Sequence, residues 1–369
     1  MNSLEGILAT GITLLGVAVA SHGVPGREAA ALPHQYAALA LRADRGPDSF
    51  RSNLVIREMA TGRVLATVTA PRPANSFCDL SGTPDGRTFV AEACKVTVKR
   101  LLGGFLVRTR PVRFARLTVD GQGQVGRLRP LRVPVPGGTR LDGAAVSPGG
   151  RMLAVASAVH IGAFPHDPLI RLYDLGTGRL LRTWRWAGRA DITGRSPVGS
   201  SASPLSWTAD GATIAFPILA GRQQRAQVRL LDTAAPGSNL RRTRVVLDFG
   251  PTQLRQFSMI PAGPDSMITP DGTRIVASTA VVSRHPASAR MTVSEFSVAS
   301  GARLAVLHTV TLDQGSATFL PVLWSSSDGS TVIAAGGLGN GLVLIIGVMT
   351  GGGFTRLPGS MAGIIQLAF

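Results

Sequence analysis

The two cysteines are the residues of this chain with the clearest pairing chemistry. Cys78 lies eight residues before Gly86, which ends an Asp-Gly turn, and Cys94 lies eight residues after it. Such residues face each other when the hairpin loop has an odd number of residues. A two-residue Asp-Gly loop shifts the pairing by one and turns the side chains to different faces. We expect a Cys78–Cys94 disulfide, with two buried reduced thiols as the alternative.

A second group of side chains is cationic. Residues 95–140 contain eleven Lys or Arg residues and a single acid, Asp120, and they enclose the apolar stretch LLGGFLV at 101–107. Cations beside an apolar tip favour contact with a membrane surface or an anionic polymer. Nucleic acid is disfavoured, because only Phe105 and Phe114 are available to stack on bases. The net charge of +17 has a simpler alternative explanation, a general excess of solvated arginine.

No arrangement of residues predicts catalysis. The chain lacks a Gly-x-Ser-x-Gly elbow, a phosphate-binding Gly-Lys-Ser/Thr loop and a His-Glu-x-x-His motif. The histidines His160 and His166 lie near Asp167, but this local cluster offers too few ligands for a metal site. The recurring turn aspartates, such as Asp85 and Asp210, are expected to be structural because turns favour Asp. We predict no catalytic residue, no metal and no cofactor.

Two tryptophans alternate with arginine in LRTWRWAGR. Trp184 and Trp186 fall on an expected outer strand, where they pack against the next repeat or form a contact patch. We interpret them as packing residues.

Turns recur along the chain at a spacing that predicts a repeated structure. Five Asp-Gly or Gly-Gly turns end at Gly86, Gly150, Gly211, Gly272 and Gly329, at intervals of 64, 61, 61 and 57 residues. Each has an apolar strand before it and a small or β-branched strand after it, as in a hairpin. A second hairpin pattern lies between the turns, as in IRLYDLGTGRLLRTW at 170–184. One repeat therefore contains four antiparallel strands, which is the unit of a propeller blade.

The two ends of the chain complement each other. The second hairpin pattern occurs six times, whereas the first occurs only five times. The segment from Tyr36 to Arg42 matches a second strand that lacks its first strand, and Ala362 to Phe369 matches a first strand that nothing follows. We expect these segments to pair in one blade. The sequence thus predicts an all-β, six-bladed propeller of four-stranded antiparallel blades, with its ring closed and no exposed edge.

The turn and hairpin sequences resemble those of WD-repeat-like propellers of the TolB type. The resemblance rests on TPDGRTFVA, TPDGTRIVA, VSPGGRMLAVAS and YDLGTGRLL, and it covers Tyr36 to Phe369. No Trp-Asp dipeptide ends the third strands, so the eukaryotic type of WD repeat is the weaker comparison. TolB-type propellers are bacterial and often periplasmic, secreted or membrane-tethered, and they serve as protein-binding platforms, sensor domains or accessory domains of peptidases. The resemblance implies a fold and leaves the ligand open.

The N-terminal part differs from the repeats. Residues 6–25 carry no formal charge and are long enough to cross a bilayer. The sequence AVAS offers a signal-peptide cleavage site after Ala20, although the preceding MNSLE lacks the usual basic residues. We interpret residues 1–33 as an apolar helix, either membrane anchor or signal segment, with a linker, and residues 34–369 as the propeller. The alternative is a Gly-rich arm packed on the domain.

These features predict a non-enzymatic binding, scaffolding or sensing module that is membrane-anchored or exported. The expected partner is a protein or an anionic cell-envelope polymer, with the membrane contacted through the N-terminal segment. One alternative is a propeller enzyme of the hydrolase or lyase type with its site at one mouth of the ring, and another is a cytoplasmic scaffold. Convergent polar residues at one mouth favour the enzyme, whereas an apolar or Arg-rich patch favours binding.

Overall fold

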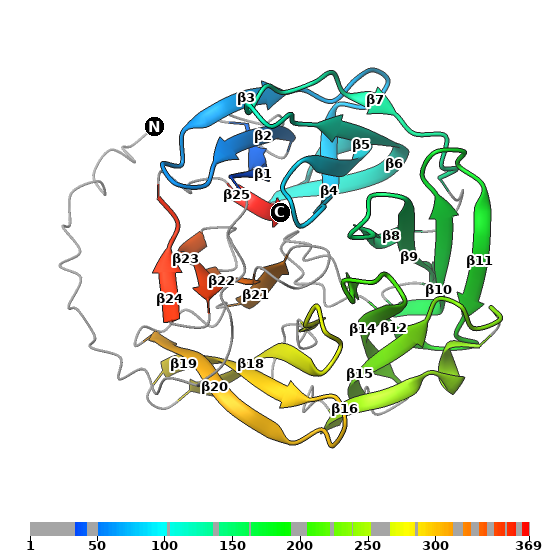
Figure 1. The fold of residues 1–369 in the computed structure, drawn as a ribbon, viewed down its shortest axis with the longest axis vertical. Coiled ribbons are helices and arrows are strands. Elements are labelled where there is room, and N and C mark those ends of the chain that lie inside the picture. Colours follow the sequence, from blue (N-terminus) through cyan, green and yellow to red (C-terminus); the bar gives the residue numbers. More distant parts are fainter. Residues whose placement is uncertain are drawn as a thin grey trace.

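The protein is an all-β propeller. The computed structural model describes residues 34–42, 51–101, 104–135, 140–161, 164–192, 205–221, 225–237, 239–251, 266–284, 287–312, 320–325, 332–337, 343–350, 353–358 and 364–368. Strands in these ranges form six antiparallel sheets arranged around a common centre (Figure 1). Antiparallel sheets repeated radially define a propeller, so the predicted class of fold is confirmed.

Successive segments of the chain build the sheets, each running from its innermost strand outward. The first sheet contains β25 (Ile364–Ala368), β1 (Gln35–Leu41), β2 (Ser52–Glu58) and β3 (Val64–Val68). The second contains β4 (Ser76–Gly82), β5 (Thr88–Leu101), β6 (Gly104–Thr118) and β7 (Arg129–Pro130). The third contains β8 (Arg140–Val146), β9 (Met152–Ile161), β10 (Phe164–Asp174) and β11 (Leu180–Arg185).

The remaining sheets follow in chain order. The fourth contains β12 (Ala190–Asp191), β13 (Ser206–Trp207), β14 (Thr213–Ala220), β15 (Arg225–Asp232) and β16 (Arg244–Pro251). The fifth contains β17 (Ser266–Ile268), β18 (Arg274–Arg284), β19 (Ala287–Ser297) and β20 (Arg303–Leu312). The sixth contains β21 (Leu320–Ser325), β22 (Val332–Gly337), β23 (Val343–Thr350) and β24 (Gly353–Arg356).

The Asp-Gly turns are held by their own side chains. Asp85 accepts hydrogen bonds from the Thr83 hydroxyl at 2.7 Å and from the Arg87 amide at 2.9 Å. Gly86 follows with a φ of 65°, a conformation that glycine adopts without steric cost. The same arrangement recurs at Asp210, whose pKa is lowered by the hydrogen bond from the Thr208 hydroxyl. The described turn aspartates are therefore structural, as predicted.

The ring is closed by strands from the two ends of the chain. β25 pairs antiparallel with β1, with Ala368 opposite Ala37 and Ile364 opposite Ala40 (Figure 1). β1 also pairs with β2 on its other side. β25 is therefore the innermost strand of a sheet that otherwise belongs to the first part of the chain, and the predicted closure is confirmed for these strands.

The prediction of six uniform four-stranded blades is wrong. Five sheets have four strands, whereas the fourth has five, because its inner edge is divided between β12 and β13. β13 pairs with β14 at Ile214 and Ala215, and β12 pairs with β14 at Leu219 and Ala220. Pro217 lies in the gap between these two stretches, and proline has no backbone N–H to donate to a ladder. The expected single inner strand is therefore interrupted.

The predicted apolar helix at residues 1–33 lies outside the described residues. Within the described ranges, the one helical element is a 3-10 turn, Leu240–Arg242. None of the helices found there is long and apolar enough to cross a membrane. The predicted N-terminal helix therefore finds no counterpart in the described chain, and the division at residue 34 stays a prediction.

The apolar core lies between neighbouring sheets. One cluster joins Ile170 of β10 and Trp184 of β11 to Phe216 of β14, and it also contains Trp186 and Trp207. The exposed fractions of Trp184, Trp186 and Trp207 are only 2%, 6% and 0%. The interpretation of Trp184 and Trp186 as packing residues is therefore confirmed, and neither tryptophan offers a contact patch.

Candidate binding surface

Buried polar side chains near the centre of the ring tie neighbouring sheets together. Asp79 of β4 accepts a hydrogen bond from the Ala144 amide of β8 at 2.6 Å. It also accepts one from the side-chain amide of Gln366 in β25 at 2.8 Å. Three sheets therefore meet at one carboxylate. The pairing was not visible in the sequence, because Asp79 and Gln366 are 287 residues apart.

The same kind of contact recurs around the ring. The Ser81 hydroxyl accepts from the Val146 amide at 3.0 Å, and the Ser206 hydroxyl accepts from the Ile268 amide at 2.9 Å. Ala145 occupies the corresponding place in β8 and has no hydroxyl, and the Trp207 indole donates to its carbonyl at 3.2 Å instead. These hydrogen bonds position the inner strands, so the groups that form them are not available to a ligand.

Two buried carboxylates lie opposite each other in neighbouring strands. Glu92 of β5 lies opposite Asp79 in the β4–β5 ladder. The two residues are only 5% and 3% exposed, so neither is open to a substrate from solvent. Among the described residues, no three His, Cys, Asp or Glu side chains gather closely enough to hold a metal ion. Asp167 accepts a hydrogen bond from the Gly188 amide at 2.6 Å, as part of a turn.

The hairpin of β5 and β6 extends beyond its sheet. β4 pairs with β5 only as far as Cys94, and β7 pairs with β6 only at Ala115 and Arg116. Beyond that point, β5 and β6 pair with each other from Lys95 opposite Arg110 to Leu101 opposite Gly104. These seven rungs at about 3.3 Å each form a two-stranded ribbon of roughly 20 Å. We call residues 95–101 and 104–110 the β5–β6 ribbon.

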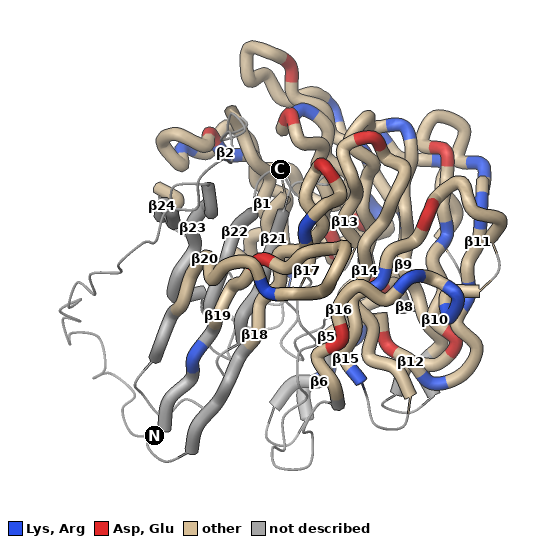
Figure 2. Tube along the Cα trace, turned by 60° about the horizontal axis from the view of Figure 1, so that its bottom comes forward, with Lys and Arg blue, Asp and Glu red and all other residues tan. Residues whose placement is uncertain are grey.

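Four cations share one face of the β5–β6 ribbon. Lys95 lies opposite Arg110, and Thr97 lies opposite Arg108. Thr97 is two residues from both Lys95 and Lys99, so all three lie on the same face of β5. Alternate residues of a strand point to the same face, as do cross-strand partners. Lys95, Lys99, Arg108 and Arg110 are all exposed, and the described residues place no carboxylate in contact with them. Elsewhere on the ring, basic and acidic positions are interspersed (Figure 2).

The base of the ribbon is clamped to β4. The structure joins Cys78 and Cys94 by a disulfide, with their Cα atoms 5.9 Å apart. The pairs Phe77–Ala93 and Asp79–Glu92 leave Cys78 in a bulge, so neither hairpin register expected from the turn applies unchanged. Asn75 continues the clamp, because its side chain accepts from the Val96 amide at 2.7 Å and donates to the Val96 carbonyl at 3.0 Å.

The disulfide gives a direct chemical prediction. In protein isolated without reductant, we expect neither Cys78 nor Cys94 to react with an alkylating agent, as read by intact mass. Reduction should lower the free energy of unfolding by an amount at the low end of about 0–5 kcal/mol, because the bond closes a short loop whose ends are already paired. Two alkylated cysteines would contradict the bond and remove the support for an oxidising compartment.

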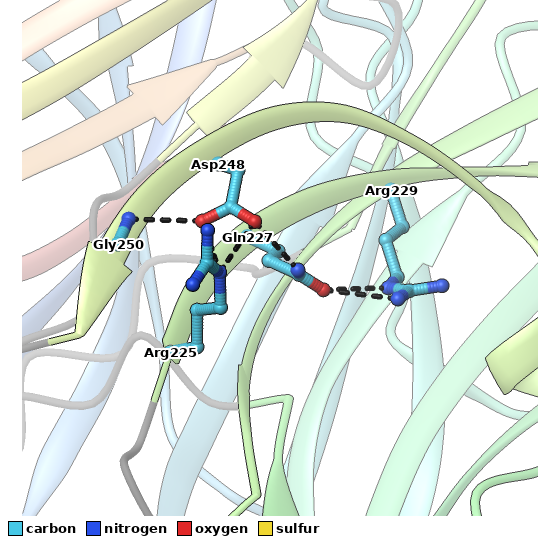
Figure 3. Close-up of polar contacts among 5 residues, drawn as sticks. All are labelled: Arg225, Gln227, Arg229, Asp248 and Gly250. Atoms are coloured by element: carbon cyan, nitrogen blue, oxygen red, sulfur yellow. Dashed lines mark hydrogen bonds and ion pairs between the residues drawn. The ribbon is translucent and has the colours of Figure 1, made fainter.

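A second charged cluster lies on β15 and β16 and is internally satisfied (Figure 3). Arg225 donates to both oxygens of Asp248 at 2.8 and 2.6 Å, and Gln227 donates to Asp248 at 2.9 Å. Burial opposes ionisation of Asp248, but hydrogen bonds from Arg225, Gln227 and the Gly250 amide hold its pKa below the usual value. Asp248 and Arg225 are therefore paired with each other, and this ion pair offers no free charge for a ligand.

The same cluster continues to a buried arginine. Arg229 donates to the Gln227 side-chain oxygen at 3.1 and 2.9 Å, and its guanidinium lies 5.1 Å from the Trp186 ring. Arg241 lies 5.3 Å from the same ring. Such cation–π contacts stabilise the packing of two sheets. The two arginines come from other elements, so the contacts do not involve the arginines that alternate with tryptophan in the sequence.

A shallow groove lies among the turns at the other end of the blades. It has a volume of about 1000 Å³ and is lined by His34, Glu58, Arg63, Gln122 and Gln124 among others. Glu58 is engaged by the Thr61 hydroxyl at 2.5 Å and by Arg63 at 3.5 Å, and these contacts lower its pKa. The lining mixes polar and apolar residues, and it carries no uncompensated run of charge comparable to the ribbon.

Comparisons with known proteins do not identify a family or an activity for this chain. No protein-family model and no curated protein matches the sequence. Similar solved structures include hydrazine synthase of Kuenenia stuttgartiensis, with 17% identity, a TM-score of 0.42, and coverage of 88% of this chain and 80% of that chain. A puromycin-hydrolysing peptidase of Mycobacterium tuberculosis has 14% identity and a TM-score of 0.45, with coverage of 88% of this chain and 46% of that chain. Oligogalacturonate lyase of Vibrio parahaemolyticus has 10% identity and a TM-score of 0.41, with coverage of 81% of this chain and 83% of that chain.

The chain thus spans less than half of the peptidase. Similarities this distant carry no argument about activity. The assignment as a propeller rests on the strand pairing of the chain itself.

Proposed function

We propose that this propeller is a non-enzymatic binding module, related to the TolB type, that engages an anionic partner through the β5–β6 ribbon. The observation that carries the proposal is the exposed row of Lys95, Lys99, Arg108 and Arg110 on one face of a strand pair that projects from the ring. Such a face attracts polyanions through space and contacts them without rearrangement. A protein with an acidic surface or an anionic cell-envelope polymer fits this charge.

The clamp at the ribbon base supports the proposal. The Cys78–Cys94 disulfide and the Asn75–Val96 hydrogen bonds fix the first rungs relative to β4. A rigid arm loses little conformational entropy on binding. The disulfide also supports an exported or membrane-anchored location, because such bonds persist in oxidising compartments.

The enzyme alternative, a hydrolase or lyase with its site at one mouth of the ring, requires convergent and accessible polar groups. The buried acids Asp79 and Glu92 do not meet that requirement, and Asp79 is committed to joining sheets. The described residues therefore favour binding over catalysis.

Charge reversal on the ribbon tests the proposal. We expect Lys99→Glu/Arg108→Glu to abolish binding to soluble polyphosphate, measured by fluorescence anisotropy. Wild-type affinity should fall steeply as salt is added, since exposed charges are screened within about 10 Å at 0.1 M ionic strength.

Arg242→Glu/Arg303→Glu is the matched control. It changes the net charge by the same amount at exposed positions away from the ribbon. Equal losses in both double variants would show a non-specific effect of net charge, and unchanged binding in the ribbon variant would contradict the proposal.

A further inference from the structure

We infer that the β5–β6 ribbon docks onto the surface of an anionic lipid bilayer, with its apolar end in the interface and its cations at the headgroups. The inference rests on the proposed function, the binding of an anionic partner by this surface, and names a lipid surface as that partner in place of a soluble protein or polymer. It follows from three observations: the projection of the ribbon, the order of residue types along it, and the clamp at its base.

The order of residue types changes along the ribbon. The three rungs nearest the ring carry three of the ribbon cations, with Lys95 opposite Arg110 and Arg108 opposite Thr97. The outer rungs pair Val98 with Val107, Lys99 with Leu106 and Arg100 with Phe105, and the last rung pairs Leu101 with Gly104. Apolar residue types therefore concentrate in the outer rungs, where Lys99 and Arg100 lie among them, and the exposed cations Lys95, Arg108 and Arg110 lie nearer the ring. An amphipathic element with this order suits a membrane interface.

The backbone of the ribbon suits an interface and not the hydrocarbon core. Its two strands satisfy each other on one side only, so their outer backbone groups need water or headgroups as partners. Insertion is therefore limited to the headgroup and upper acyl region, about 5–10 Å deep. With a length of roughly 20 Å, the ribbon keeps Lys95, Arg108 and Arg110 outside the apolar region and the ring in water. Lys99 lies in an outer rung, and a long lysine stem of this kind lets the ammonium group reach the headgroups.

The membrane accounts for the apolar end better than a soluble polymer does. A dissolved polyanion interacts favourably only with the cations, since it offers no apolar phase for Phe105 and Leu106. In a bilayer each of the two kinds of residue contributes: a Lys or Arg near an anionic surface is worth roughly fivefold in affinity. Burial of two large apolar side chains is worth on the order of 100-fold.

The experiment compares vesicles of phosphatidylcholine with and without phosphatidylglycerol, using the full chain in sedimentation. Wild type should bind the anionic vesicles more tightly. Phe105→Ser/Leu106→Ser should lose on the order of 100-fold in vesicle affinity, while its polyphosphate affinity stays unchanged. Lys99→Glu/Arg108→Glu should lose both activities.

Fluorescence supplies an independent readout. Tryptophan emission should shift to shorter wavelength when anionic vesicles are added to Phe105→Trp. The control Val64→Trp, at a half-exposed position beside the turns at the opposite end of the blades, should behave as wild type. A shift confined to Phe105→Trp supports docking through the ribbon end.

The outcomes separate the two proposals. Wild-type vesicle affinity in Phe105→Ser/Leu106→Ser, with no shift in Phe105→Trp, overturns membrane docking. If Lys99→Glu/Arg108→Glu still loses polyphosphate, the ribbon is then a polymer-binding surface and the proposed function stands. If that charge variant keeps all binding, both proposals fail.

Discussion

A chain that lacks its last eight residues should lose most of its stability. The deletion removes β25, whose Ile364, Leu367 and Ala368 are at most 2% exposed, and it leaves β1 as an unpaired inner edge. Burying a large aliphatic side chain contributes about 1.5–3 kcal/mol. Loss of this strand therefore removes an amount comparable to the roughly 5–15 kcal/mol of a typical domain. Thermal unfolding followed by circular dichroism measures the effect.

Gln366→Ala in the full chain is the companion variant. It keeps the strand and removes only the side-chain bonds to Asp79 and to the Leu80 carbonyl, both at 2.8 Å. We expect a loss of about 1–3 kcal/mol, since buried partners are left unsatisfied. A truncated chain that melts at the wild-type temperature would show that β25 does not close the ring.

Closure of the ring was predictable because turn chemistry is local. Asp-Gly turns such as the one at Gly86 need a particular side chain at a particular place, so their spacing revealed the repeat. Counting the strands then indicated that the segment beginning at Tyr36 lacks a first strand and that the segment ending at Phe369 supplies one. Stabilising contacts between sheets were not predictable in the same way, because Asp79 meets Gln366 only after the ring has formed.

The failures have identifiable causes. The prediction of six uniform blades overlooked Pro217, whose missing donor interrupts the inner edge of the fourth sheet. A regular hairpin of either register contains no bulge, whereas Cys78 lies in a bulge that no turn residue signals. The ribbon did leave a signal, because no turn residue occurs between Thr88 and the Gly-Gly pair at 103–104, which makes β5 twice as long as β4.

Removing the β5–β6 ribbon should abolish binding while leaving the ring folded. Replacement of residues 96–109 by Asn-Gly leaves Lys95 and Arg110 as the last rung, joined by a two-residue turn. The residues removed pair mainly with one another. The cost to stability should therefore be about 1–3 kcal/mol, from the buried Val96 side chain and its hydrogen bonds to Asn75.

An equivalent cut in another hairpin is the control. Replacing residues 281–290 by Asn-Gly shortens the long β18–β19 hairpin to the rung of Ala280 and Met291. This variant should keep wild-type affinity for anionic ligands, because the ribbon cations are untouched.

Equilibrium binding of the ribbon-shortened chain to polyphosphate and to phosphatidylglycerol vesicles tests the account most directly. Circular dichroism and the melting curve establish that the ring is intact, so a loss of binding can be assigned to the ribbon. We predict no detectable binding to either ligand by the ribbon-shortened chain and full binding by the β18–β19 control. Wild-type affinity of the ribbon-shortened chain for both ligands would contradict the assignment of the β5–β6 ribbon as the binding surface.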